Sequence, residues 1–228
     1  MLAASLLTTT QVILTTLVGI LALGWALYRV AWIELLADNR QQHLLFGSIF
    51  LLFVLWLVRR EFDNGLTFHF IGLTAVTLLL NWPLAIVAGA LAQVALVLIG
   101  WDDAAALGAN GLLRVLLPVA VTLLVSRGLE RLKPTNLFLY IFVSGFFAAA
   151  LAAVVTILAG MGLLLWSGHF TAPQSLLEVF GYLLLVAFPE AFINGTVITG
   201  LVVFHPHWLA TFDSDRYLQE PFEPKDKP

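Results

Sequence analysis

Not one charged side chain occurs between Thr135 and Leu177, and several other stretches are nearly as free of charge. A helix needs about 20 mostly apolar residues to cross the hydrocarbon core of a bilayer, so these stretches constrain the fold more than any other feature. Of the 228 residues, 61% are hydrophobic and 11% are charged, which excludes a soluble globular enzyme and a disordered chain. The sequence therefore predicts an all-α integral membrane protein.

Seven apolar segments are predicted to form transmembrane helices. They comprise residues 6–28, 44–58, about 68–81, 83–100, 111–126, 136–166 and 176–204. Asn81-Trp82-Pro83 predicts a tight turn after the short third segment, because proline disfavours helix in the residue before it. We expect the long sixth helix to loosen near Gly160-Met161-Gly162. The transmembrane domain is expected over residues 1–206 and a cytoplasmic tail over 207–228, with the proline-rich end from residue 205 loosely ordered.

Most positive charges fall in loops that this arrangement puts on one side of the membrane. With an outside N-terminus, the inner segments hold Arg29, Arg40, Arg127, Arg131, Lys133, Arg216, Lys225 and Lys227. The outer segments hold only Arg59 and Arg60, and Arg114 lies inside a span. Because cytoplasmic loops carry the excess of Lys and Arg, we expect an N-out, C-in protein of the bacterial inner membrane.

Several functions are excluded by what the chain lacks. It has no cysteine, which rules out disulfides, thiolate metal sites and cysteine nucleophiles. The net charge is only −3 and no basic block occurs, which argues against nucleic acid as a partner. None of the three lysines follows a glycine-rich loop, so ATP-driven transport would need the ATPase of another chain. We expect no enzyme activity and no resident cofactor, because neither a zinc-protease pair nor a serine nucleophile motif occurs.

Glu190 and Arg114 lie inside apolar segments, where a charge costs a few kcal/mol unless it is paired or hydrated. Two interpretations of Glu190 stay open. It lines a polar cavity or senses a ligand, or it bonds to Arg114 or to neighbouring Ser and Thr side chains and fixes packing. Arg114 lies only a few residues inside the outer end of its segment, so we expect its side chain to snorkel to water.

The predicted topology divides the five histidines. His69 and His169 lie toward the outside, and His43, His205 and His207 lie toward the cytoplasm, so one metal site cannot use both groups. We expect His43 to be solvated and the pair around Pro206 to cap helix carbonyls. His69 opens the third segment, and both a structural role and a ligand role stay open for it.

Small residues give the fourth segment a face suited to close helix contact. Ala85, Ala88, Gly89 and Ala92 follow one another three and four residues apart. Gln93 adjoins this face and can donate a hydrogen bond across it. The sequence leaves open whether the contact lies within the chain or with a partner.

Five short motifs occur in an order that points to a known family. They are His69-Phe70-Ile71-Gly72, Asn81-Trp82-Pro83, Gln93, Leu107-Gly108-Ala109-Asn110 and Pro189 through Gly195. From about Ala31 to Arg131 the chain resembles the membrane subunits that capture cobalt or nickel for energy-coupling factor (ECF) ABC transporters, the CbiM/NikM type. It is most similar to an uncharacterised bacterial branch labelled as ECF transporter permeases.

The resemblance implies a seven-helix substrate-capture subunit in membrane lipid, working with a transmembrane coupling (T) subunit and two ATPases. In that family the metal lies near the outer face. His69 supplies one ligand, and an N-terminal Met-His supplies its amine and imidazole. This chain begins Met1-Leu2-Ala3, so that second histidine is absent. His169, Asp63 and the Met1 amine are the candidate replacements.

Four further residues are expected at the substrate site, partly from the same resemblance: Asn110, Gln93, Glu190 and Asn194. Asn194 stands where the family often has a Glu. Asn110 and Gln93 are expected to hold the shape of a small outer cavity closed by residues 59–67 and 101–110.

The leading hypothesis is a substrate-binding component of an ECF-type importer, with cobalt or nickel as the expected ligand. One alternative is a transporter-derived protein that binds another small solute or regulates a neighbour without the ATPases. A third hypothesis, an intramembrane enzyme using Glu190 and a histidine, is disfavoured because every histidine is nearer a membrane face.

Overall fold

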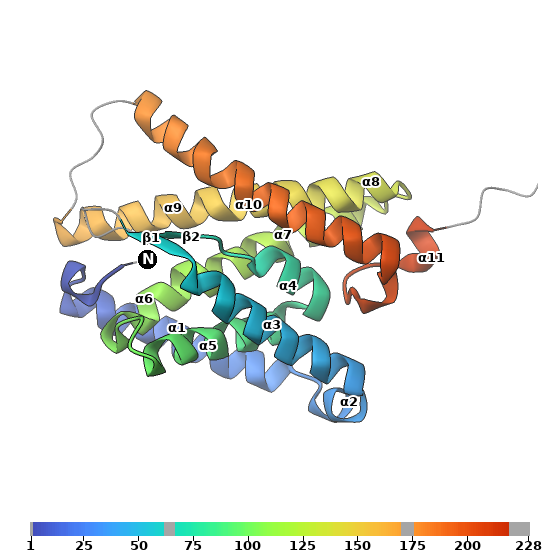
Figure 1. Ribbon diagram of the computed structural model, residues 1–228, viewed down its shortest axis with the longest axis horizontal. Coiled ribbons are helices and arrows are strands. Elements are labelled where there is room, and N and C mark those ends of the chain that lie inside the picture. Colours follow the sequence, from blue (N-terminus) through green and yellow to red (C-terminus); the bar gives the residue numbers. More distant parts are fainter. Residues whose placement is uncertain (1, 62–66, 170–175, 219–228) are drawn as a thin grey trace, which may run out of the picture.

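The computed structural model describes residues 2–61, 67–169 and 176–218. Figure 1 shows an elongated helical bundle, with β1 and β2 toward one end and α2 and α11 toward the other. The first part of the chain forms η1 (Ala4–Leu6), α1 (Thr9–Arg29), α2 (Trp32–Ala37), α3 (Asn39–Leu57), β1 (Arg59–Glu61), β2 (Thr67–His69), α4 (Leu73–Leu80) and α5 (Trp82–Leu98). The second part forms η2 (Ala104–Ala106), α6 (Leu107–Gly111), η3 (Leu112–Leu116), α7 (Leu117–Leu132), α8 (Leu137–Leu139), η4 (Tyr140–Phe147), α9 (Ala148–Ser167), α10 (Leu176–Phe204), η5 (Pro206–Trp208) and α11 (Ser214–Tyr217).

Among the described residues, five helical stretches are long and apolar enough to cross a membrane. They are Thr9–Arg29, Asn39–Leu57, Ala104–Leu132, Leu137–Ser167 and Leu183–Phe204. α5 is apolar but has 17 residues, and α4 has 8, which is about 12 Å at 1.5 Å per residue. The chain is therefore a helical, multi-pass membrane protein. The count of seven crossings and the N-out, C-in orientation stay predictions.

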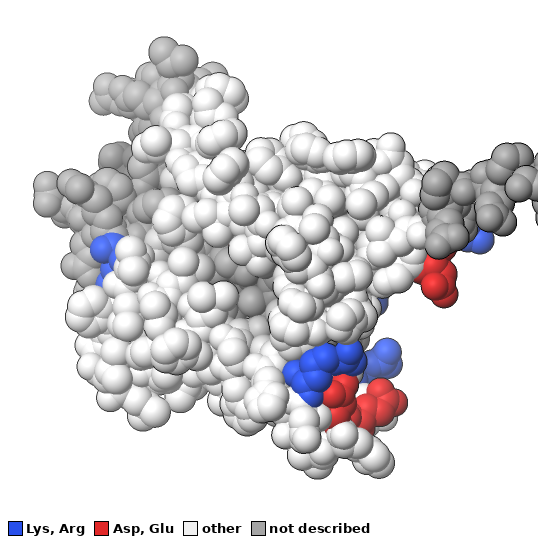
Figure 2. All heavy atoms as spheres, turned by 45° about the vertical axis from the view of Figure 1, so that its right-hand side comes forward, with Lys and Arg blue, Asp and Glu red and all other residues white. Residues whose placement is uncertain are grey.

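The surface of the bundle is suited to lipid. Large apolar side chains on the outer faces of α1, α3 and α10 are more than half exposed, among them Leu21, Phe50 and Phe192. On the face drawn in Figure 2, charged side chains gather toward the ends, and the described surface between them carries none. Exposed apolar area of this extent is rare on soluble monomers, whereas the hydrocarbon core of a bilayer requires it.

The third apolar segment is not the single helix predicted over about 68–81. Residues 67–69 form β2, Gly72 has a left-handed conformation with φ 71°, and α4 begins only at Leu73. A Cβ on Gly72 would meet only the tips of the Leu55 and Leu52 side chains, which can move, so glycine is needed here for its left-handed conformation. The prediction that His69 opens a helix is therefore wrong, because a strand and a turn separate it from α4.

The turn predicted at Asn81-Trp82-Pro83 is confirmed. Asn81 has φ 67° and separates α4 from α5, and its Oδ1 accepts a hydrogen bond from the Trp82 N–H at 2.8 Å. Pro83 then lies in the first turn of α5, where its missing N–H costs nothing.

Two long helices contain π-helical segments. In η3 the Leu117 N–H bonds to the Leu112 carbonyl, five residues back. Pro118 follows directly and has no N–H to donate to the Arg114 carbonyl, which explains why the regular helical pattern breaks here. In the helix from Leu137 to Ser167 the irregular part is η4. α9 continues unbroken through residues 160–162, so the loosening predicted there is wrong.

The small-residue face of α5 packs within the chain. Ala85, Ala88 and Ala92 are fully buried, and a Cβ on Gly89 would lie 2.8 Å from both methyl groups of Val115 in η3. Small side chains let helices approach closely, and van der Waals contact then holds them together where lipid supplies no hydrophobic driving force. Of the two possibilities left open by the sequence, this face therefore serves an internal contact.

Residues 205–218 pack against the bundle, so the prediction of a loosely ordered end is wrong for this part of the tail. Their apolar side chains join a buried cluster with α4, η4 and α10. The N–H groups of Ala210 and Thr211 donate to the carbonyls of Leu79 and Leu78 at 3.1 and 3.3 Å, and the Thr211 hydroxyl donates to Leu78 at 3.0 Å. The tail thereby pairs carbonyls that the C-terminal end of α4 leaves open.

Candidate functional site

His69 is buried in a pair of short strands between α3 and α4. β1 and β2 are antiparallel, with Arg59 opposite His69. The His69 side chain is 6% exposed, and its Nδ1 lies 2.7 Å from the Phe70 carbonyl oxygen. Because a carbonyl only accepts, Nδ1 carries the proton and the lone pair lies on Nε2. Because the ring is buried near the Arg114 guanidinium, where a second positive charge would be costly, it is neutral and able to bind a metal ion.

The backbone after His69 is non-helical, and side chains from other helices bond to its polar groups. The Ile71 carbonyl accepts from Trp56 Nε1 at 3.0 Å. The N–H groups of Ile71 and Gly72 donate to the two oxygens of the Glu190 carboxylate, each at 2.8 Å. An unpaired backbone group in hydrocarbon costs several kcal/mol, so these bonds are what allows extended backbone inside the bundle.

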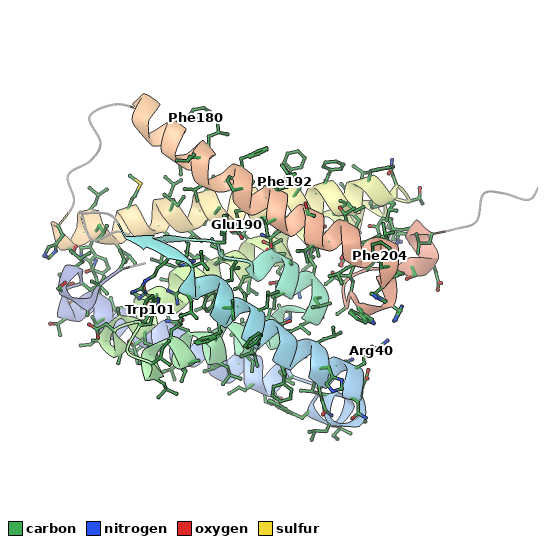
Figure 3. The ribbon with its side chains drawn as sticks, in the orientation of Figure 1. Arg40, Trp101, Phe180, Glu190, Phe192 and Phe204 are labelled. Atoms are coloured by element: carbon green, nitrogen blue, oxygen red, sulfur yellow. The ribbon has the colours of Figure 1, made fainter. Side chains whose placement is uncertain are left out.

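Glu190 and Asn194 together cap the N-terminus of α4. Asn194 Oδ1 accepts from the Ala75 N–H at 2.9 Å, and its Nδ2 donates to the Glu190 carboxylate at 2.8 Å. Figure 3 shows Glu190 on the side of α10 that faces the bundle and Phe192 on the opposite side. A carboxylate at a helix N-terminus is also favoured by the helix dipole. These contacts agree with the packing interpretation of Glu190, with backbone amides as its partners in place of Arg114. Ligand binding by either residue stays a prediction.

The motif at residues 107–110 ties α6 to α5 and α1. The Leu107 carbonyl accepts from Gln93 Nε2 at 2.8 Å. Gly108 lies so close to α1 that a Cβ would be 2.5 Å from the backbone nitrogen of Thr16. The motif therefore fixes how α6 packs against α5 and α1.

Asn110 holds the N-terminal segment inside the protein. Its Oδ1 accepts from the Leu2 N–H at 3.0 Å, and its Nδ2 donates to the Leu2 carbonyl at 3.1 Å. Two bonds from one amide fix both the position and the direction of the chain. Leu2 is 4% exposed and packs with Leu113 and Leu164. The N-terminal segment therefore lies against η3, at the residue that directly precedes Arg114.

Three charged side chains form a buried network beside Trp56. Asp102 accepts from Nη1 of Arg59 and from Nη1 of Arg114, each at 2.7 Å. The Arg114 guanidinium lies 4.6 Å from the centre of the Trp56 ring, and the His69 ring centre lies 6.3 Å from the same ring. Arg114 is fully buried next to His69, so the prediction that it snorkels to water is wrong.

Of the predicted metal ligands, His69 is the one that the structure places in the interior. His169 is exposed at the end of α9, where its Nδ1 lies 3.3 Å from the Ser167 hydroxyl. Asp63 and Met1 lie outside the described residues. Within the described parts of the chain, no group of three His, Cys, Asp or Glu side chains is placed to hold a metal ion.

Sequence reasoning did not single out Trp56, Asp102 or the Leu2 backbone, although all three belong to this region. Trp56 looks like any other apolar residue of its helix, and Leu2 resembles the many leucines of the chain. One signal was available for Asp102. A buried arginine needs a counter-charge, and Asp102 closely precedes the apolar segment that carries Arg114.

The fold and the site define a multi-pass membrane protein in which an N-terminal segment, the non-helical backbone before α4, a buried histidine and an ion network lie close together. Non-helical backbone within a membrane-spanning bundle is tolerated where it is buried in protein, as in many membrane transporters. Over residues 2–208 the sequence matches the CbiM family, described as the cobalt uptake substrate-specific transmembrane region, and the chain belongs to this family of membrane transport proteins.

The same fold occurs in a solved structure. A chain described as a truncated transition metal transporter superposes with a TM-score of 0.67 and 18% sequence identity, over 90% of this chain and 99% of that one. At this identity the likeness establishes the shared fold. No curated protein matches the sequence.

Proposed function

We propose that the chain is the substrate-capture component of an importer for a divalent transition metal, cobalt or nickel. The observation that carries the proposal is the buried, neutral imidazole of His69, whose Nε2 lone pair is available to a ligand. Imidazole nitrogen is a donor that suits both ions. Membership of a family described as a cobalt uptake region supports the same choice of ligand.

The N-terminal segment is proposed to form part of the metal site. Asn110 directs this segment into the bundle beside η3, and η3 also carries Arg114 near His69. The Met1 amine is the proposed second nitrogen ligand. His169 and Asp63 remain candidates for further ligands from the outer side. Leu2 fills the position of the family's second histidine, so the site has one imidazole fewer.

We further propose that the chain works as part of an ECF-type transporter in the bacterial inner membrane, with its N-terminus outside. It would then need a coupling subunit and separate ATPases, because it has no phosphate-binding loop of its own. Affinity purification of the tagged chain from its native membrane tests this. Co-purification of an ATPase pair supports the importer.

One observation favours a second candidate, a transporter-derived protein that takes another small solute. Among the predicted metal ligands that the structure describes, His69 is buried and His169 is exposed, so the described residues bring one imidazole into the interior. The two functions differ in a measurable way, because the second predicts binding of an organic solute, no high-affinity metal binding and no associated ATPase.

Titration calorimetry with Ni²⁺ and Co²⁺ on the purified full chain tests the metal. His69→Ala should weaken binding at least about tenfold, as expected for the loss of a ligand. The control His43→Ala removes an exposed imidazole on α3 and should leave binding unchanged. Equal binding by the wild type and His69→Ala would remove His69 as a ligand. No binding by the wild type, whether the ion is added alone or in complex with a chelator, would remove the metal.

A further inference from the structure

Arg114 keeps two unpaired donors in the protein interior. Its Nη1 donates to Asp102 and its face lies on the Trp56 ring, but Nε and Nη2 have no hydrogen-bond partner among the described residues. The side chain is fully buried, so bulk water does not solvate these atoms. Buried donors of a charged group are normally paired, because leaving them unpaired costs the full desolvation penalty.

The two unpaired nitrogens form one edge of the guanidinium. Nε and Nη2 project their hydrogens in parallel, and this fork matches the two oxygens of a carboxylate. Asp102 occupies the opposite corner of the group and Trp56 covers a face. The edge that remains is therefore the one best shaped for a planar, anionic partner.

The charges around this edge also favour an anion. Arg114 shares its carboxylate partner, Asp102, with Arg59, so Asp102 is not available to pair with the free edge of Arg114. The nearby Glu190 carboxylate is already bonded to the N–H groups of Ile71 and Gly72. A bare divalent cation beside the buried guanidinium would be repelled, whereas an anionic ligand would neutralise it.

We propose that the ligand bound beside His69 carries a carboxylate, which pairs with the Nε–Nη2 edge of Arg114. The captured species is then a metal in complex with a small carboxylate chelator rather than a bare ion. This inference rests on the proposed function, since it describes the ligand of the same site. It also accounts for the missing second imidazole, because a chelator supplies oxygen ligands that the chain does not.

Calorimetry on the full chain with four probes tests the inference. The probes are Ni²⁺ alone, citrate alone, the equimolar nickel–citrate complex and the uncharged triamide of citrate. We expect the complex to bind at least about tenfold more tightly than Ni²⁺ alone, and the triamide not to bind. Arg114→Lys keeps a positive charge for Asp102 but lacks the fork, so it should bind the complex about tenfold to a hundredfold more weakly. The control Arg40→Lys changes an exposed arginine paired with Asp38 and should bind as the wild type does.

The outcomes separate this inference from the proposed function. Binding of citrate alone as tightly as of its nickel complex, lost in Arg114→Lys, supports the carboxylate site and contradicts metal capture. Binding of Ni²⁺ alone as tightly as of its complex, with no effect of Arg114→Lys on the complex, overturns the inference and leaves metal capture standing. Failure of every carboxylate to bind overturns it as well. Should Arg114→Lys not fold, the wild-type comparison of citrate with its triamide decides on the carboxylate.

Discussion

At the scale of single residues, Glu190 accepts more hydrogen bonds from the backbone just before α4 than any other side chain described above. Its carboxylate accepts from two backbone N–H groups and from Asn194. In Glu190→Gln an amide NH₂ replaces one acceptor oxygen and faces another donor. We expect a loss of about 1–3 kcal/mol of unfolding free energy, visible as a lower thermal midpoint in detergent. Glu34→Gln on the exposed face of α2 is the control, and equal midpoints for the two variants would contradict the capping role.

Gly108 makes a second prediction at this scale. A Cβ there would meet the backbone of Thr16 at 2.5 Å, and backbone does not move aside as a side-chain tip does. Gly108→Ala should therefore destabilise the protein by about 1–3 kcal/mol or more. Gly128→Ala, on an exposed face of α7 with nothing within 4 Å, should instead be neutral or stabilise the helix by up to about 1 kcal/mol. A Gly108→Ala protein that melts with the wild type would contradict the close α1–α6 contact.

The sequence showed which charged residues are costly to place in a membrane, but it did not show which groups they bond to. Glu190 and Arg114 stand out because a charge in an apolar run needs a reason. The partners of Glu190 lie far away along the chain, at Ile71 and Gly72, whereas Asp102, the partner of Arg114, precedes it by 12 residues. Hydrophobic periodicity carries no information on such pairings, so the sequence predicted which residues matter and not what they hold.

At the scale of elements, α4 is a short helix held at both ends by other parts of the chain. The Thr211 hydroxyl donates to the Leu78 carbonyl at the end of α4 and therefore accepts from the Tyr140 hydroxyl, 2.8 Å away. Thr211→Val keeps the shape and removes both bonds. Hydrogen exchange followed by mass spectrometry should show faster exchange in the last turn of α4, consistent with a loss of about 1–2 kcal/mol. Thr196→Val on the exposed side of α10 is the control, and identical exchange in both would contradict the tail's role.

The same helix shows where prediction of elements ends. Apolar content placed the helical segments correctly, and Asn81-Trp82-Pro83 marked the end of α4. Its beginning was missed, because the break depends on the positive φ of Gly72 and on a distant carboxylate that pairs the freed N–H groups. An apolar run reads the same whether its first turn is helical or extended. The length of an apolar run therefore indicates whether it can cross a membrane, but it does not show where the backbone departs from a helix.

At the scale of the whole molecule, the absence of cysteine gives a direct test of orientation. Ala105 lies in η2 and Thr135 lies between α7 and α8; both are exposed, and the positive-inside rule puts them on opposite sides. Ala105→Cys should react with a membrane-impermeant maleimide in intact cells, and Thr135→Cys only after the membrane is opened. The reverse pattern would contradict the N-out, C-in orientation, and with it an outward-facing site at His69.

The central claim of this account is that His69 and the inserted N-terminal segment mark the place where the ligand is captured. X-ray diffraction from crystals grown with nickel, collected at the nickel absorption edge, tests it most directly. The account predicts an anomalous peak about 2.1 Å from His69 Nε2, the usual distance for a metal–imidazole bond. A peak at His205 or His207 with none beside His69 would contradict it.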